Sequence, residues 1–185
     1  MILELLLIAL LIILIVVSVI IPVTFLLALM GWTWTGVPYV PLPTHALKRL
    51  PDLLALNKDS VLYDLGCGDG RVLYELAKHS DATFIGIEKA PLPYLIAISR
   101  SAFSKKKNVK IVFGDIHAVP LTNATHVFTY LLPDVMEKLY PKLKRELASG
   151  SKVLSCDFKF AAQEPASIVV EKNTSRPYTL RIYEF

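Results

Sequence analysis

The N-terminal part of the chain has a different hydrophobic pattern from the remainder. From Leu5 to Met30 no charged residue occurs, and Leu, Ile and Val dominate without leaving a polar face at helical spacing. As an α-helix this run would reach about 39 Å, whereas the hydrocarbon core of a bilayer is about 30 Å thick. We therefore predict that residues 1–30 form one transmembrane anchor, with a kink or break at Pro22.

A buried core helix and a cleaved signal peptide both fit this apolar run less well. A buried core helix is usually shorter and shows a polar face. A cleaved signal peptide begins with Lys or Arg, but this chain carries Glu4 there, and no small-x-small cleavage site ends the run. The segment is therefore expected to stay on the mature protein.

Residues 31–43, with the sequence GWTWTGVPYVPLP, are rich in Pro, Gly and aromatic side chains. Such a composition favours an extended connector over a helix or a strand. Trp32, Trp34 and Tyr39 would lie at the membrane–water interface, where aromatic residues are enriched. We predict a juxtamembrane connector here, followed by a folded domain over residues 44–185.

Helix-like and strand-like patterns alternate within this domain. Such alternation is typical of an α/β fold with a mainly parallel sheet covered by helices on both faces. The last two strand-like runs have no helix between them and predict an antiparallel hairpin at one edge of the sheet. The patterns place helices at 44–56, 71–79, 91–103 and 134–147, and strands at 61–66, 83–87, 109–113, 126–131, 152–157, 167–171 and 178–184.

The distribution of charge predicts an orientation in the membrane. The formal net charge is +4, and all 20 lysines and arginines lie after the apolar run. The first of them, Lys48 and Arg49, follow the run closely, and a positively charged flank marks the cytoplasmic side of a span. We therefore expect a single-pass membrane protein with a cytoplasmic domain, and the lipid bilayer as one of its partners.

The densest basic patch comprises Lys105–Lys107 and Lys110. It fits a solvated loop at least as well as a contact with lipid, and no aromatic residues alternate with its charges as they do in many nucleic-acid-binding surfaces. No nucleic acid partner is expected. The two cysteines, Cys67 and Cys156, show neither metal-ligand nor disulfide spacing, so we expect no metal and reduced thiols.

The strand at 61–66 runs into the sequence Asp64-Leu65-Gly66-Cys67-Gly68-Asp69-Gly70, which opens a helix. Glycines at such a turn allow tight backbone geometry and let a ligand approach the main chain. The dinucleotide fingerprint GxGxxG would need a glycine where this chain has Arg71, and the GK[ST] of a Walker A loop is missing. The spacing therefore disfavours NAD and FAD and excludes a Walker A phosphate loop.

An acidic residue ahead of GxGxG resembles motif I of the class I S-adenosylmethionine-dependent methyltransferases, and the likeness extends to the end of the chain. It implies a Rossmann-like class I methyltransferase sheet, methyl-transfer activity and S-adenosyl-L-methionine as the cofactor. A carboxylate suits the ribose diol of that cofactor, because each of its oxygens can accept one hydroxyl. By this resemblance the cofactor-binding residues are Asp64 for the amino group, Gly66, Gly68 and Gly70 for the methionine part, Glu88 for the ribose and Asp115 for the adenine amino group.

Longer segments are similar to the small single-span lysine methyltransferases related to the mitochondrial enzymes that modify the adenine nucleotide translocator and the ATP synthase c-subunit. These segments are the apolar run, YVPLP, LGCGDGRV and VMEKLYPKLKRELASGSKVLSCDF. The resemblance implies N-methylation of a lysine in a membrane-associated protein. The chain departs from those enzymes at Cys67, where they more often have Ser. Its Tyr130-Leu131-Leu132-Pro133 replaces the Asn/Asp-Pro-Pro-Tyr/Phe of enzymes acting on nucleobases or glutamine, which argues against DNA adenine and glutamine amide substrates.

Methyl transfer to lysine requires a neutral amine, so the lysine pKa near 10.4 must fall or its proton must leave. Tyr130 and Asp134, at the end of the fourth strand, are the catalytic candidates for positioning the amine, and Asp157 is a weaker one. Each has a structural alternative, since Tyr130 could belong to the core and Asp134 could cap a helix.

Two other functions stay open: a methyltransferase for a small or lipidic molecule, and a non-catalytic cofactor-binding module that regulates a membrane partner.

Overall fold

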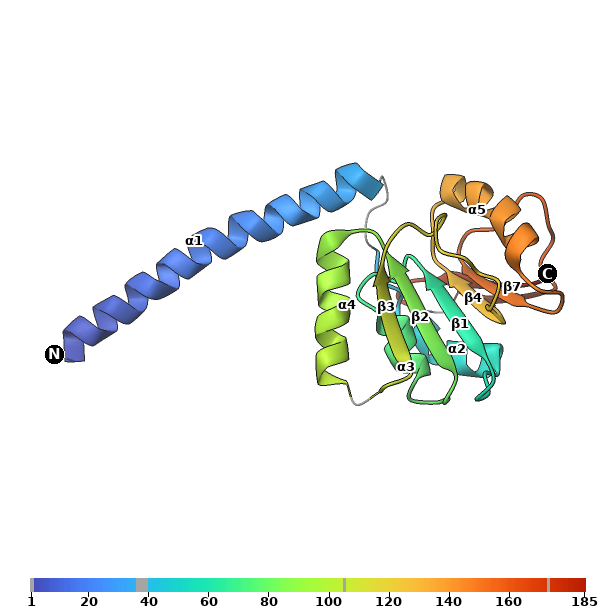
Figure 1. Cartoon of the computed structure of the whole chain (residues 1–185), viewed down its shortest axis with the longest axis horizontal. Helices are drawn as coiled ribbons and strands as arrows, with labels where there is room; N and C mark the ends of the chain where they lie inside the picture. Colours follow the sequence, from blue (N-terminus) through green and yellow to red (C-terminus); the bar gives the residue numbers. More distant parts are fainter. Residues whose placement is uncertain (1, 36–39, 105, 173) are drawn as a thin grey trace.

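The N-terminal segment forms one long helix that projects from a smaller α/β domain (Figure 1). The computed structural model describes residues 2–35, 40–104, 106–172 and 174–185. Helix α1 spans Ile2–Thr35, and within it Ile2–Leu26 has a mean hydropathy of 3.5 and no burial against the rest of the protein. By length and composition this stretch could cross a membrane.

Two details of α1 differ from the sequence-based expectation. The helix continues through Pro22 without a break, because a proline removes only one backbone donor and the neighbouring turns keep theirs. Thr24 lies two residues later, and its hydroxyl donates to the carbonyls of Ile20 and Ile21 at 2.9 Å. The helix also ends at Thr35, five residues beyond the predicted end of the span, so residues 31–35 are helical and not extended. Residues 36–39 of the predicted connector, including Tyr39, lie outside the described part.

The sheet has seven strands in the order β3-β2-β1-β4-β5-β7-β6. The first five pair in parallel, and β7 is antiparallel to both β5 and β6. This confirms the class I sheet with an antiparallel C-terminal hairpin. The strands are β1 Val61–Leu65, β2 Thr83–Glu88, β3 Val109–Phe113, β4 His126–Thr129, β5 Lys152–Cys156, β6 Ser167–Glu171 and β7 Tyr178–Glu184.

Helices cover the two faces of the sheet unequally. The remaining helices are α2 Thr44–Leu54, α3 Arg71–Leu76, α4 Pro91–Phe103 and α5 Pro133–Glu146. Residues of α2 and α3 pack into one hydrophobic cluster, and residues of α5 pack into the cluster on the other face. Helices therefore lie on both faces, as expected, and among the described helices α5 is the one that contributes residues to the second cluster. The segment 114–125 between β3 and β4 contains no helix and packs there through Leu121.

The packed unit begins before Thr44. Leu42, which the sequence assigned to the connector, is buried in the cluster with α2 and α3. The carbonyl of Pro43 accepts a hydrogen bond from the Leu47 amide at 3.0 Å and so closes the first turn of α2. The last part of the connector is thus held against the domain.

The two cysteines should remain free thiols in the native protein. Cys67 follows β1 and Cys156 ends β5, and β4 lies between these strands, which places their Cα atoms about 9.5 Å apart, beyond disulfide reach. Burial, the largest effect, raises the pKa of both thiols and suppresses the reactive thiolate. We expect no reaction with an aromatic disulfide reagent before unfolding and two thiols per chain in denaturant. Loss of thiol titre under mild oxidation would contradict the strand order.

Candidate active site

The glycine loop between β1 and α3 adopts a conformation that favours glycine. Gly66, Gly68 and Gly70 have φ angles of 80°, 58° and 75°. A Cβ at Gly66 would also lie 2.8 Å from Cδ2 of Leu131, in the turn that follows β4. The loop is fixed to β2, because the Ile87 carbonyl accepts hydrogen bonds from the amides of Gly66 and Cys67 at 2.9 and 3.0 Å. The main chain is therefore held rigidly at the carboxyl end of the parallel strands.

Glu88, at the end of β2, supports this loop from one side. Its Oε2 accepts a hydrogen bond from the Gly68 amide at 2.8 Å, and its Oε1 accepts one from the Ala90 amide at 2.7 Å. The residue is 8% exposed. Each carboxylate oxygen has a second lone pair, so the same group can still accept hydroxyl donors from a ligand. These backbone contacts had no signal in the sequence.

Asp64 is a buried carboxylate that lacks a partner at one oxygen. The residue is 2% exposed, and its Oδ2 has no hydrogen-bond donor among the described residues. Burial, followed by the charges of Glu88 and Asp69, raises the pKa of Asp64 well above its ordinary value. A buried carboxylate without a partner is costly. A positively charged ammonium group would satisfy it, and the amino group of S-adenosylmethionine is one.

Asp115 follows β3 at the same end of the sheet. Its Oδ2 accepts a hydrogen bond from the Lys89 ammonium at 2.8 Å, and its Oδ1 accepts one from the His117 amide at 2.9 Å. The Lys89 hydrogen bond, then that of the His117 amide, lowers the pKa of Asp115, which is therefore ionised at neutral pH. Its side chain is 38% exposed and open to a further donor.

A second carboxylate of the loop, Asp69, has a structural role that the sequence did not reveal. It accepts hydrogen bonds from Arg71 at 2.9 Å and from Arg100 of α4 at 2.8 Å. Burial alone would raise its pKa, but the two guanidinium groups lower it. Asp69 thus ties the glycine loop to α4.

Tyr130 and Asp157 lie together on the other side of the site. The Tyr130 hydroxyl oxygen accepts a hydrogen bond from the Arg176 guanidinium at 2.7 Å, and its ring stacks on Phe158. Burial, and next the Asp157 charge, raises the pKa of Tyr130 to about 12, so the phenol is protonated at neutral pH. Arg176 also donates to the Pro41 carbonyl at 3.2 Å. The connector, the hairpin turn and Tyr130 therefore meet at one point.

The other two catalytic candidates differ in how firmly they are held. Asp157 has a φ of 62°, and its Oδ1 accepts a hydrogen bond from the Thr179 amide at 2.9 Å. Asp134 is exposed in the first turn of α5, and none of the hydrogen bonds found in the described chain joins it to Tyr130. The structure thus brings Tyr130 and Asp157 together and leaves Asp134 at the surface.

Residues 64–167 match the model of the ANTKMT methyltransferase domain. The chain belongs to this family. A protein-lysine N-methyltransferase of Saccharolobus islandicus is 31% identical over 151 residues, which cover 80% of this chain and 92% of that protein. The human lysine N-methyltransferase of the ATP synthase c-subunit is 29% identical over 73% of this chain, but the match spans only 58% of its length.

Solved structures of other methyltransferases have the same architecture. An RNA methyltransferase of Salinibacter ruber, in complex with S-adenosyl-L-homocysteine, superposes with a TM-score of 0.73 at 32% identity and covers 78% of this chain and 93% of that chain. The C-terminal domain of a precorrin-6Y methyltransferase from Rhodobacter capsulatus, with 17% identity and a TM-score of 0.64, shares the fold alone. The protein is an S-adenosylmethionine-dependent methyltransferase of the ANTKMT family.

Proposed function

We propose that this enzyme methylates a lysine side chain of a membrane-associated protein, with α1 spanning the bilayer and the domain on the cytoplasmic side. The observation that carries the proposal is the similarity to the Saccharolobus islandicus protein-lysine N-methyltransferase, which extends over 92% of that protein. The unburied apolar stretch Ile2–Leu26 of α1 supports the membrane association. The lysines and arginines that follow α1 support the orientation.

We assign the cofactor-binding roles to residues at the carboxyl ends of the strands. The unpaired Asp64 carboxylate would bind the amino group, the loop from Gly66 to Gly70 would pack on the methionine part, Glu88 would bind the ribose hydroxyls and Asp115 the adenine amino group. S-adenosylmethionine supplies an activated methyl group, so the protein has mainly to align a nucleophile with it.

Tyr130 is our candidate for holding the acceptor amine. Its oxygen accepts one hydrogen bond from Arg176 and can accept another from a lysine N–H. The fixed positive charge of Arg176 disfavours a protonated amine nearby, which lowers the pKa of the incoming lysine. Asp157, whose charge acts on Tyr130, could take up the released proton, and Asp134 could contact the acceptor from the surface.

Incubation of membranes with the full-length enzyme and radiolabelled S-adenosylmethionine tests the substrate class. We expect label in protease-sensitive material, and methylated lysine after acid hydrolysis. Organic extraction detects label in lipid, and ribonuclease digestion detects label in RNA. RNA is included because the similar Salinibacter ruber protein is an RNA methyltransferase. The Asp64→Asn variant serves as the control with impaired cofactor binding. Label in lipid or RNA would overturn the lysine assignment, and no label in any fraction would favour a non-catalytic module.

Two truncations test the role of the connector. A chain that starts at Gly36 keeps Leu42 and the Pro41 carbonyl, whereas one that starts at Thr44 loses the buried leucine and the acceptor of Arg176. Burial of a leucine contributes roughly 1.5–3 kcal/mol, so the shorter form should melt at a lower temperature. We expect both forms to bind the cofactor, and only the shorter one to lose activity on detergent-solubilised acceptor at saturating concentration.

The outcomes separate a tether from a part of the active site. Equal activity of the two forms would mean that residues 36–43 only link the anchor to the domain. If neither truncation impairs methylation in intact membranes, α1 does not act by raising the effective concentration of the enzyme near its acceptor.

A further inference from the structure

Helix α4 exposes large apolar side chains on its outer face, beside Ser99 and Arg100, and also packs apolar side chains on its inner face. On the inner side Ala97 is fully buried, and the ring of Tyr94 lies 5.0 Å from that of Phe113 between centroids. A surface helix of a soluble domain normally turns polar residues outward. In α4, by contrast, Leu95 and Ile96 are 45% and 42% exposed, and Phe103 is 91% exposed.

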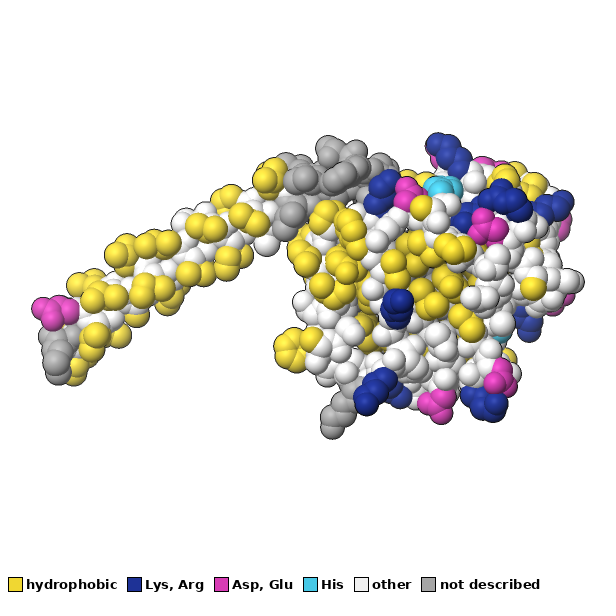
Figure 2. Space-filling view, viewed as in Figure 1, with side chains coloured by type: hydrophobic (Ala, Val, Ile, Leu, Met, Phe, Trp, Pro, Cys, Tyr) yellow, Lys and Arg dark blue, Asp and Glu magenta, His cyan; other side chains and the backbone are white. Residues whose placement is uncertain are grey.

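This outer face lies on the side of the domain from which α1 departs. Helix α1 contacts α4, and Figure 1 shows α4 along the edge of the domain nearest to α1. Figure 2 shows apolar side chains gathered over α4 beside the end of α1. The described side chains of α1 are exposed from Ile2 to Leu26. The exposed apolar stretch Ile2–Leu26 and the exposed apolar side chains of α4 therefore belong to two helices that contact each other.

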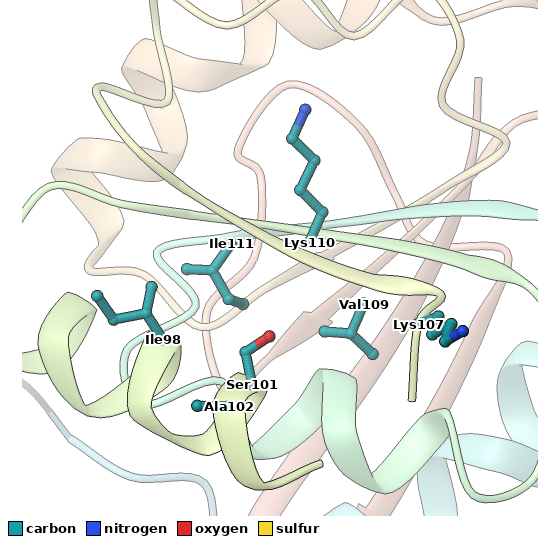
Figure 3. A pocket seen from close by; sticks show the side chains of 7 residues that line it. All are labelled: Ile98, Ser101, Ala102, Lys107, Val109, Lys110 and Ile111. Carbon is teal, nitrogen blue, oxygen red and sulfur yellow. The ribbon is translucent and has the colours of Figure 1, made fainter. Parts of the chain in front are cut away.

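Lysines follow the outer face of α4 directly. Lys106 and Lys107 come three and four residues after Phe103, while Lys105 lies outside the described part. Lys110 lies on the edge strand β3, and Figure 3 shows its side chain directed away from α4. An apolar helix face next to lysines is the pattern of helices that lie in the interface of an anionic membrane.

The C-terminal half of α4 also borders an open hollow against the beginning of β3 (Figure 3). Ile98, Val109 and Ile111 contribute apolar side chains to its lining, and Lys107 contributes a cation. These apolar side chains and this cation suit the boundary between the acyl chains and the phosphates of a lipid leaflet. The hollow lies at the amino end of β3, so lipid there would leave the glycine loop accessible.

We propose that the outer face of α4, with Lys106 and Lys107 at its C-terminal end, rests on the anionic surface of the bilayer that α1 spans. The proposal depends on the membrane span inferred above. It would fix the orientation of the active site, because α4 begins next to Glu88 and is joined to the glycine loop through Arg100 and Asp69. The carboxyl ends of the strands then lie beside the point where α1 leaves the membrane (Figure 1).

Fluorescent labels on the full-length chain in vesicles test this contact. Phe103→Cys provides a labelling site on α4, and Ile168→Cys provides the control on β6, at the other edge of the sheet, where the wild-type residue is 53% exposed. The native cysteines are buried and should stay unlabelled. In vesicles of phosphatidylcholine and phosphatidylserine, we expect spin-labelled lipid to quench the label at 103 and iodide to quench the one at 168.

A charge-reversal variant tests the electrostatic part. Lys106→Glu with Lys107→Glu should make the label at 103 accessible to iodide, whereas Ile168→Glu with Val170→Glu should leave it protected.

Similar accessibility of the two labels in chains that resist alkaline extraction would overturn the docking of α4 but leave the span intact. A label at 103 that is shielded from iodide yet unquenched by lipid would assign this face to a protein partner and overturn the proposal. Release of the chain by alkali would overturn both the span and the docking.

Discussion

Replacing Glu88 with alanine should weaken the binding of S-adenosylmethionine by about 1.5–3 kcal/mol, a loss of roughly 10- to 150-fold in affinity. The variant removes the carboxylate proposed to bind the ribose. It also removes the acceptor of the Gly68 and Ala90 amides, which hold the glycine loop against the start of α4. We therefore expect a lower melting temperature as well, because each buried amide left unpaired costs roughly 1–3 kcal/mol.

Titration calorimetry on purified protein measures the affinity, and thermal melts without cofactor measure the stability. The matched control is Glu75→Ala on α3, which removes an ion pair with Lys78 and should leave affinity unchanged. If Glu88→Ala binds the cofactor as tightly as the wild type, the ribose assignment is wrong.

Replacing Asp64 with asparagine should have opposite effects on binding and on stability. The cofactor loses the carboxylate proposed to pair with its ammonium, so affinity should fall by at least about 10-fold, as for other charge-assisted hydrogen bonds. The free protein should become more stable at neutral pH, because a buried carboxylate with an unpaired oxygen is removed. An active-site residue that destabilises the free fold is a known compromise between stability and function.

The dependence on pH distinguishes this electrostatic cause from a general gain in packing. The folded-state pKa of Asp64 is raised by burial and by the neighbouring carboxylates, so the unfolded chain releases this proton at a lower pH than the folded chain. Wild-type stability therefore falls as the pH rises from the unfolded pKa near 3.9 toward the folded one. The variant lacks this loss, and the gap between the two melting temperatures should widen over that range. A variant that is less stable than the wild type at neutral pH would show that Asp64 already has a favourable partner.

Local sequence patterns predicted most of the strands, helices and turns that position the site. Alternating helix and strand signals, with the rule that βαβ crossovers are right-handed, predicted a mainly parallel sheet, and the two last strand-like runs predicted its antiparallel hairpin. The spacing of Gly66, Gly68 and Gly70 placed a ligand-binding turn after β1. The resemblance to class I methyltransferases pointed to the acids at the ends of β2 and β3. These features depend on residues close in the chain, which is why a single sequence contained them.

Contacts between distant segments were not predictable in this way. Arg176 reaches Tyr130 and Pro41 only because the C-terminal hairpin and the connector converge on the end of β4. The burial of Leu42 likewise depends on how the connector meets α2, and its neighbours in the sequence gave no sign of it. The uneven covering of the sheet was also missed, since periodicity does not show which face each helix will pack on.

The position of the strand ends limits which lysines the enzyme can reach. The cofactor loop and the end of α1 lie at the same end of the domain (Figure 1). With α1 in the bilayer and α4 on its surface, as proposed, the methyl group would sit at a fixed height above the lipid. The enzyme would then select acceptor lysines by their distance from the membrane. A lysine located where a transmembrane helix emerges from the bilayer would lie at this distance whatever its neighbouring sequence. A lysine on a soluble domain far from the bilayer would lie out of reach whatever its neighbouring sequence.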